Sequence, residues 1–198
     1  MEEKELEKLL ADSAMFDCET GVRLAHKYGA PLTPTIIKYV AINKNLNLCK
    51  WIVEDLAFDS ETKKAYYEIL EEEASCRAAF AVRHSEHDVA INLWDFLNYL
   101  LSKKIVRVNQ VLKRSARYGN HSATEWALVN GANDYEQALA GSEWNGHFYC
   151  TKLIETCQEN AQQRPEPRLV EEIIKEFIKD ALDDPFESFD WVKPFLIK

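Results

Sequence analysis

Apolar residues recur along this chain at the spacing of short helices, and these predicted helices fall into pairs. Thr33 and Pro34 are suited to cap and begin the clearest of them. Its apolar residues lie on one helical face and are Ile36, Ile37, Val40 and Ala41. A polar turn over residues 43–45 separates this stripe from a second one over residues 46–53. The pattern therefore predicts a hairpin of two antiparallel helices.

The same layout recurs twice further along the chain. One pair of apolar stripes flanks Gly119, and the next pair, which Asn133 and Asp134 are suited to cap, flanks Gly146. The two glycines are 27 residues apart, and the residues around them superpose without a gap. Helix pairs that repeat every roughly 20–50 residues are typical of a solenoid, in which each unit buries its faces against its neighbours. Positive φ is expected at four turn or helix-end glycines: Gly29, Gly119, Gly131 and Gly146.

The segment between these hairpins is interpreted as a degenerate unit. Residues 59–73 are acidic and helical in character, and we interpret them as an insertion. The first helix of the unit is then expected to contain Ala78, Ala79 and Val82, and its second helix to cover residues 89–101. Small residues late in the first helices let stacked hairpins approach closely, and the expected matching set is Ala41, Ala116 and Ser142.

The C-terminal part is expected to differ from the repeats. Residues 158–168 are polar and contain two prolines, so they predict a linker. An amphipathic pattern and an aromatic stretch follow it. We interpret residues 166–198 as a helical cap, because the terminal units of a solenoid must close its core. The alternative is a short motif that docks on a partner. Truncation at Asp184 separates the two, since loss of a cap should unfold the protein.

The residues around the later glycines resemble a known repeat. Residues 131–135 read GANDY, Ala138 and Leu139 follow, and residues 146–148 read GHF. This order resembles the divergent ankyrin repeats that are abundant in large DNA viruses of protists. Residues 119–132 resemble the second half of such a unit at full length.

Two earlier segments resemble the same repeat with departures from it. Residues 17–30 look like the second helix of an early unit. Residues 44–54 keep the apolar positions, although Lys44 replaces the glycine. Residues 35–36 are Thr and Ile, where the family has Leu and His.

The resemblance implies an all-α fold: an ankyrin-like helical repeat solenoid of stacked αα-hairpins in a single repeat domain, residues 1–198. About five divergent units would cover residues 13–157. Another αα-solenoid is the alternative. Repeats of the ankyrin type act as protein-interaction scaffolds without catalysis. The resemblance therefore implies a partner protein bound at the concave face, a host protein if the source is a virus.

Composition and charge narrow the possible functions and locations of the protein. The chain has 24 Lys and Arg against 33 Asp and Glu, a net charge of −9, which argues against a general nucleic-acid binder. No apolar run approaches the roughly 20 residues that span a bilayer, and the acidic start is unlike a signal peptide. We therefore expect no membrane partner and a cytoplasmic localisation, in the host cell if the source is a virus. The five cysteines are accordingly expected to be reduced and buried.

No set of residues predicts catalysis or a cofactor. The sequence lacks a glycine-rich phosphate loop and the H-E-x-x-H, C-x-x-C and G-x-S-x-G motifs. Two thin groups of potential ligands are not expected to hold a metal: Cys76, His84 and His87, and His147, Cys150 and Cys157. The acidic run at residues 71–73 is interpreted as a solvated face. An enzyme on a helical scaffold is therefore the least favoured function.

The most informative charge feature is a basic stretch inside the acidic chain. Residues 96–124 contain no acid, and their charged residues are Lys103, Lys104, Arg107, Lys113, Arg114 and Arg117. Superposing the units on Gly119 and Gly146 puts Arg117 level with Trp144, one step past the buried face. An Arg beside a Trp is the composition of an interaction hot spot. The predicted partner-binding residues are Lys113, Arg114, Arg117, Tyr118 and Trp144.

Two alternatives stay open for this surface. Trp144 could instead fold back onto its neighbour as packing. The basic stretch over residues 103–117 could instead bind nucleic acid or phosphate, with an affinity that falls steeply with salt. The sequence leaves the identity of the partner and the oligomeric state undetermined.

Overall fold

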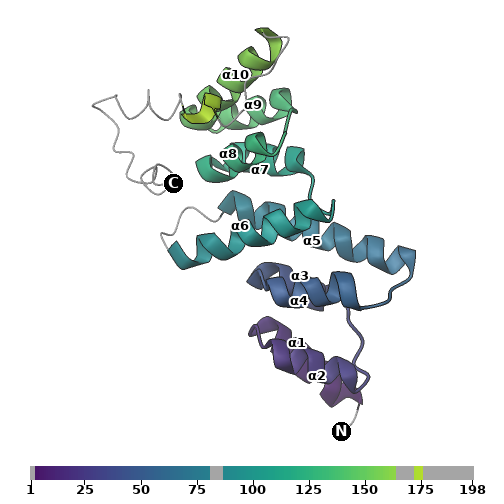
Figure 1. Cartoon of the computed structure of the whole chain (residues 1–198). Helices are drawn as coiled ribbons and strands as arrows, with labels where there is room; N and C mark the ends of the chain where they lie inside the picture. Colours follow the sequence, from purple (N-terminus) through teal and green to yellow (C-terminus); the bar gives the residue numbers. More distant parts are fainter. Residues whose placement is uncertain (1–2, 81–86, 164–171, 176–198) are drawn as a thin grey trace. The chain divides into compact units, whose positions relative to one another are not determined.

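The computed structural model describes residues 3–80, 87–163 and 172–175, and all regular structure in these ranges is helical (Figure 1). The chain divides into two compact units, unit 1 at Met1–Gln110 and unit 2 at Val111–Lys198. The predicted all-α class is confirmed. The ankyrin-like form of the repeat stays a prediction.

Unit 1 contains two helical hairpins followed by two longer helices. In chain order they are α1 (Glu3–Met15), α2 (Glu19–Lys27), α3 (Pro34–Asn43), α4 (Leu46–Lys50) with the π-helical turn η1 (Trp51–Asp55), α5 (Ser60–Phe80) and α6 (His87–Ser102). α1 packs against α2 and α3, and α3 packs against α5. Thr33 and Pro34 begin α3 as predicted, although the Thr33 side chain makes no capping hydrogen bond. The core of the unit includes Leu10, Val22, Ile37, Leu48, Leu70 and Phe96.

Unit 2 holds the two hairpins that the glycine spacing predicts. The helices are α7 (Val108–Tyr118), whose first three residues still belong to unit 1, α8 (His121–Val129), α9 (Tyr135–Trp144) and α10 (Phe148–Gln163). α10 packs against both α9 and α8. Asn120 caps α8, because its Oδ1 accepts from the Ala123 N–H at 3.1 Å. The buried side chains include Val111, Leu112, Leu128, Ala138, Leu153 and Ile154.

One turn geometry recurs at 27-residue spacing inside each unit. One or two positions after the first helix of a hairpin, a residue has a positive φ, which is 58° at Asp17, 56° at Lys44, 71° at Gly119 and 70° at Gly146. The N–H of the next residue donates to the carbonyl five positions earlier, as His147 does to Ser142 at 2.9 Å. This bond satisfies a helix-end carbonyl and reverses the chain. The period is therefore a property of the backbone, which Lys44 maintains despite its side chain.

A buried hydroxyl pair repeats with the same period in unit 2. Thr124 Oγ1 lies 3.0 Å from Ser115 Oγ, and Thr151 Oγ1 lies 2.9 Å from Ser142 Oγ. Each pair joins the first helix of a hairpin to its second helix. Ser115 is therefore the counterpart of Ser142, and the predicted match between Ala116 and Ser142 is wrong by one residue.

Two predicted boundaries are wrong. The acidic segment 59–73 is not separate from the helix after it, because α5 runs unbroken from Ser60 to Phe80. This stretch contains neither Gly nor Pro, so nothing in its backbone chemistry ends the helix. The predicted linker over residues 158–168 begins too early, because α10 continues to Gln163.

Most of the predicted C-terminal cap, residues 166–198, lies outside the described residues. Residues 172–175 are described and helical, and Ile173 and Ile174 are buried. Val82, which was assigned to the degenerate unit, also lies outside them. The cap and the docking motif both stay predictions.

The prediction of a solvated face for the acidic run at residues 71–73 is wrong for Glu71, which is buried, and for Glu73, which is half-buried, whereas Glu72 is exposed. Glu71 on α5 is only 8 % exposed and accepts from the Arg107 backbone N–H at 3.2 Å and from the Arg107 guanidinium. Glu73 pairs with Lys38 on α3 at 3.0 Å. These carboxylates connect elements of unit 1 to one another, which is a structural role.

The cysteines divide into two groups. Cys49, Cys150 and Cys157 are buried as predicted, and all five thiols are free. Cys18 is exposed and Cys76 is half-buried, so the prediction is wrong for these two. Cys18 occupies the N-cap position of α2, directly after the turn at Asp17, where a side chain faces outward.

Candidate functional site

The predicted binding residues lie on α7 and α9 of unit 2, and the structure brings these helices together. Lys113 Nζ on α7 donates to Gln137 Oε1 on α9 at 2.7 Å. One turn further along, a Cβ built on Gly141 would lie 3.4 Å from the Cβ of Arg117. Trp144 follows Gly141 by one helical turn. Arg117 therefore lies level with Gly141, one helical turn before Trp144.

Three aromatic side chains at the helix ends face the solvent. Trp144, the last residue of α9, is 90 % exposed. Phe148, the first residue of α10, is 70 % exposed, and Tyr118, the last residue of α7, is 42 % exposed. The alternative in which Trp144 folds back as packing is therefore wrong. Exposed apolar surface of this kind marks interaction sites.

The two turns that carry these aromatics lie against each other. The His147 imidazole sits over Gly119, where an added Cβ would lie 2.5 Å from Nδ1. Because Tyr118 precedes Gly119, it lies beside the turn that joins α9 to α10. We call the following four residues the aromatic patch: Arg117, Tyr118, Trp144 and Phe148.

Phe148 is absent from the predicted set, although the sequence holds a signal for it. The buried stripe of α10 consists of Cys150, Leu153, Ile154 and Cys157. Phe148 precedes this stripe by two residues, which places it about 200° around the helix from Cys150. An apolar residue so far from the buried stripe is expected to face the solvent.

Part of the basic stretch is neutralised within unit 1. Lys103 pairs with Glu54 at 2.6 Å, and Glu54 also accepts from the Tyr99 hydroxyl at 3.1 Å. The hydrogen bonds from Lys103, which has the larger effect, and from Tyr99 lower the pKa of the Glu54 carboxyl. Arg107 pairs with Glu71. Two cations of the basic stretch are thus committed to carboxylates of the chain, which weakens the nucleic-acid alternative.

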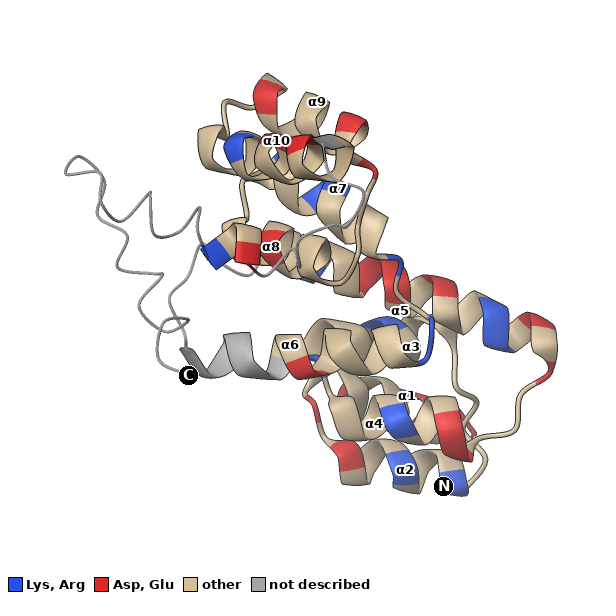
Figure 2. Cartoon of the chain, turned by 45° about the horizontal axis from the view of Figure 1, so that its top comes forward, with Lys and Arg blue, Asp and Glu red and all other residues tan. Residues whose placement is uncertain are grey.

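The cations of α7 lie in a different electrostatic setting. α7 carries no acidic residue (Figure 2). Lys113 donates to a neutral amide, and the guanidinium carbon of Arg117 lies 6.0 Å from the centroid of the Tyr118 ring. Among the residues that the structure describes, neither cation has a carboxylate within ion-pair distance. Arg114 is half-buried. Lys113 and Arg117 therefore keep their charge available to a partner.

A second polar cluster lies between α8 and α10. The His121 ring meets the Tyr149 ring edge-on with centroids 4.4 Å apart, and its Nδ1 lies 3.7 Å from Cys150 Sγ. Burial, followed by the charge of His147, lowers the pKa of His121 to about 4. Burial raises the pKa of the Cys150 thiol to about 11, and the Thr124 hydroxyl partly offsets this. Nucleophilic cysteines need a thiolate, so this neutral pair is not arranged for catalysis.

Glu125 belongs to the same cluster, one turn after His121 on α8. Burial raises the pKa of the Glu125 carboxyl to about 7. Burial, followed by the charge of Glu125, raises the pKa of the Tyr149 phenol. Perturbed pKa values can mark active sites. Here Cys150 is fully buried in the packing between two helices, so we interpret the cluster as structural.

The thin groups of potential metal ligands do not form a site in the described part of the chain. The His147 ring lies against Gly119, whereas Cys150 lies next to His121. Within residues 3–80, 87–163 and 172–175, no three His, Cys, Asp or Glu residues are placed to hold a metal ion. His84 and the side chain of His87 lie outside the described residues.

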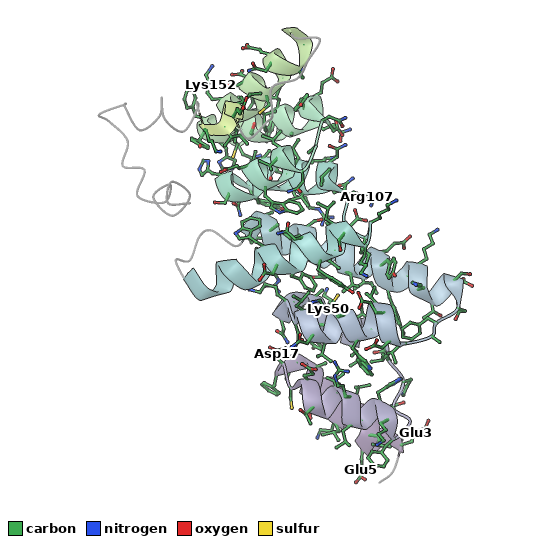
Figure 3. All side chains as sticks on the ribbon, viewed as in Figure 1. Glu3, Glu5, Asp17, Lys50, Arg107 and Lys152 are labelled. Carbon is green, nitrogen blue, oxygen red and sulfur yellow. The ribbon has the colours of Figure 1, made fainter. Side chains whose placement is uncertain are left out.

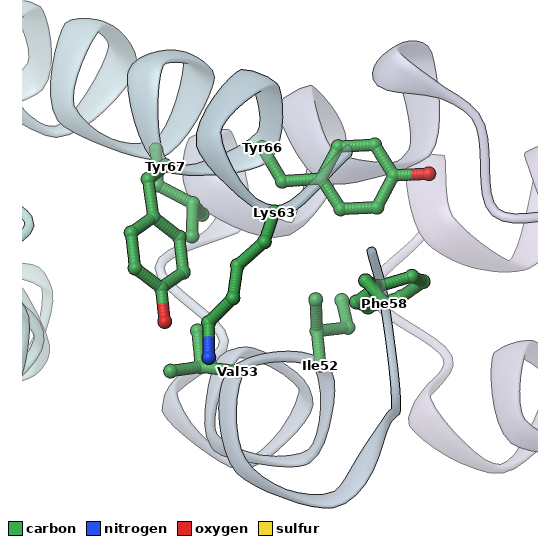
Figure 4. Close-up of a pocket in the computed structure, with 7 residues that line it drawn as sticks. Ile52, Val53, Phe58, Lys63, Tyr66 and Tyr67 are labelled. Carbon is green, nitrogen blue, oxygen red and sulfur yellow. The ribbon is translucent and has the colours of Figure 1, made fainter. Parts of the chain in front are cut away.

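Unit 1 contains a small hollow between η1 and α5 (Figure 4). Its cavity volume of about 10 Å³ is far below the ~300–1,000 Å³ of typical ligand pockets. The Tyr66 hydroxyl points away from it and donates to the Leu32 carbonyl. The lining is mostly apolar and consists of Ile52, Val53, Phe58, Lys63, Tyr66, Tyr67 and Leu70. We assign this hollow to packing.

Comparisons with known proteins add no assignment to this geometry. No family model matches the chain, and neither a curated protein nor a solved structure matches it. Among the described helices, none combines the length and the apolar character that crossing a bilayer requires.

Proposed function

We propose that this protein is a non-catalytic interaction module that binds another protein through the α7/α9 face. The observation that carries the proposal is the 90 % exposure of Trp144, which lies one helical turn beyond the contact of Arg117 with Gly141. Trp and Arg are the side chains most enriched in binding hot spots. Lys113 extends the same face along α7, and Phe148 extends it onto α10.

Burying the Trp144 side chain against a partner is more favourable in free energy than leaving it in water. A fully buried aromatic side chain removes roughly 150–250 Å² of surface from water. At about 25 cal/mol per Å², that burial contributes about 4–6 kcal/mol before the costs of association. Trp144 alone could therefore anchor a complex.

The repeated hairpins support a scaffold role. Turns 27 residues apart, at Asp17 and Lys44 and again at Gly119 and Gly146, give each unit a repeating backbone. We interpret this repeat as ankyrin-like, and proteins with such repeats bind other proteins without catalysis. The resemblance also supports action inside a cell, in the cytoplasm of a host cell if the source is a virus.

A pull-down from the cells of origin tests the proposal. We expect Arg117→Ala/Trp144→Ala to recover at least about tenfold less partner than the wild type, because both hot-spot side chains are lost. Both residues are exposed and outside the core, so the melting temperature should stay unchanged. The matched control is Phe16→Ala/Lys27→Ala, which removes an exposed aromatic and an exposed cation from unit 1. Equal recovery by the wild type and the Arg117→Ala/Trp144→Ala variant would contradict the proposal.

A further inference from the structure

The electrostatics of the α7/α9 face identify the chemistry of the partner, a step that rests on the function proposed above. α7 contributes three cations and no acid (Figure 2). Lys113 and Arg117 lie one turn apart on its exposed side, without a carboxylate partner among the described residues. The face therefore offers positive charge for a carboxylate to complement, although the whole chain carries −9.

The positive charge lies next to an aromatic side chain, because the guanidinium carbon of Arg117 is 6.0 Å from the centroid of the Tyr118 ring. Gly141 has no side chain, so the backbone of Arg117 approaches α9 closely, and a Cβ on the glycine would lie 3.6 Å from the Arg117 Cα. Trp144 lies one turn beyond this contact. A ligand that pairs with Arg117 through a carboxylate must therefore extend by about one helical turn, roughly 5.4 Å, to reach Trp144.

The Phe148 side of the patch is close to neutral. Lys152 Nζ lies 5.9 Å from the centroid of the Phe148 ring, and Lys152 also pairs with Glu155 at 3.0 Å (Figure 3). α9 carries two exposed carboxylates, Glu136 and Glu143, and no cation. Carboxylates of a ligand are therefore favoured over α7, and apolar groups over α9 and α10.

We propose that this face binds an acidic segment of the partner protein that also carries an aromatic or aliphatic side chain. The carboxylates of the segment pair with Lys113 and Arg117, and its apolar side chain packs against Trp144 and Phe148. Arg pairs with a carboxylate through two parallel hydrogen bonds. Apolar contact beside the ion pair removes water and strengthens the attraction. A neutral segment lacks the ion pairs, and a purely acidic one lacks the anchor.

Three short fluorescein-labelled peptides test this with the full chain by fluorescence anisotropy. The first alternates Asp or Glu with Phe or Leu, the second replaces its acids with Asn and Gln, and the third replaces its apolar residues with Ser. We expect the first peptide to bind at least about tenfold more tightly than either of the others. Arg117→Ala should abolish the roughly tenfold difference in affinity between the first and second peptides. Added salt should reduce the same difference in the wild type. Lys27→Ala, which removes an exposed cation of unit 1, should change nothing.

The outcomes separate the partner's chemistry from the binding function itself. Equal affinity for the first and second peptides, or an unchanged affinity in Arg117→Ala, would overturn the acidic segment. If the peptides fail this test but Trp144→Ala still lowers partner recovery in the pull-down, the proposed interaction function stands and only the acidic segment is ruled out. If Trp144→Ala changes neither partner recovery nor peptide affinity, the proposed function fails as well.

Discussion

Gly119→Ala is expected to lower the free energy of unfolding of unit 2 by about 3 kcal/mol, for two separable reasons. The residue has a φ of +71°, a conformation that costs an L-residue about 1–2 kcal/mol. The added Cβ would also lie 2.5 Å from Nδ1 of His147 and 2.8 Å from its Cγ, which no unstrained contact allows. The imidazole must therefore move, and the stacking of the two turns is lost.

Two further variants separate these causes in urea denaturation followed by circular dichroism. Gly131 also has a positive φ, +90°, but nothing lies within 4 Å of its Cβ position. Gly131→Ala should therefore cost only the conformational part, about 1–2 kcal/mol. His147→Ala should remove the additional cost of Gly119→Ala, because the overlapping ring is gone. Equal losses for the two glycine variants would show that the turns do not lie against each other.

Glu125→Gln is expected to stabilise unit 2 by about 2–3 kcal/mol at pH 8 and by almost nothing at pH 4. The folded-state pKa of about 7 lies above the usual glutamate value of 4.5, because burial disfavours the charged carboxylate. The folded state therefore holds this proton more tightly, and stability falls as pH rises through the window between the two values. Gln removes the cost of ionisation. Glu143→Gln, which removes an exposed carboxylate from α9, is the matched control and should change stability by less than about 0.5 kcal/mol.

His121 is expected to make the stability of the Glu125→Gln variant fall on acidification. The pKa of His121 is lowered from 6.5 to about 4, so its contribution to stability is complete above pH 6.5 and is lost as pH falls toward 4. In the wild type this slope opposes that of Glu125 between about pH 4.5 and 6.5. Glu125→Gln should therefore lose stability on acidification through this range, where the two wild-type contributions nearly cancel. A stability difference between variant and wild type that is equal at pH 4.5 and pH 8 would contradict the burial of Glu125.

The parts of the fold that local chemistry determines could be predicted from the sequence. Gly119 and Gly146 end first helices because positive φ is cheap for glycine, so both hairpins of unit 2 are where the spacing puts them. The expected repeat predicts a boundary near residue 73, between an insertion and a repeat helix, but residues 60–80 form one helix. Its own sequence contains no residue that ends a helix.

Contacts between residues far apart in sequence could not be predicted. Glu71 looks like one member of an exposed acidic run, and its burial depends on Arg107, which is 36 positions away. The match of Ser115 with Ser142 depends on hydroxyl contacts that span nine residues. Such positions are decided by packing, which periodicity alone does not specify.

At the candidate site, too, the sequence predicts the helices that belong to the repeat and does not predict the contacts between distant residues. The 27-residue register aligns Arg117 with Trp144, whereas the contacts place Arg117 level with Gly141, one helical turn before Trp144. The register could not say whether Trp144 is packed or exposed, because that depends on how the turn before Phe148 directs the chain. It also could not separate Lys113 from Lys103, since the ion pair of Lys103 with Glu54 joins different helices.

Photo-cross-linking from position 144 tests the proposed interaction face most directly. A photoreactive benzoylphenylalanine replaces Trp144, and the protein is irradiated in an extract of the cells that produce it. Position Phe16, which is 75 % exposed on unit 1, carries the same group as a control. We expect a discrete adduct with another protein from position 144, absent from position 16 and reduced at least about tenfold by Arg117→Ala. No adduct from position 144, or the same adducts from both positions, would contradict a binding role for this face.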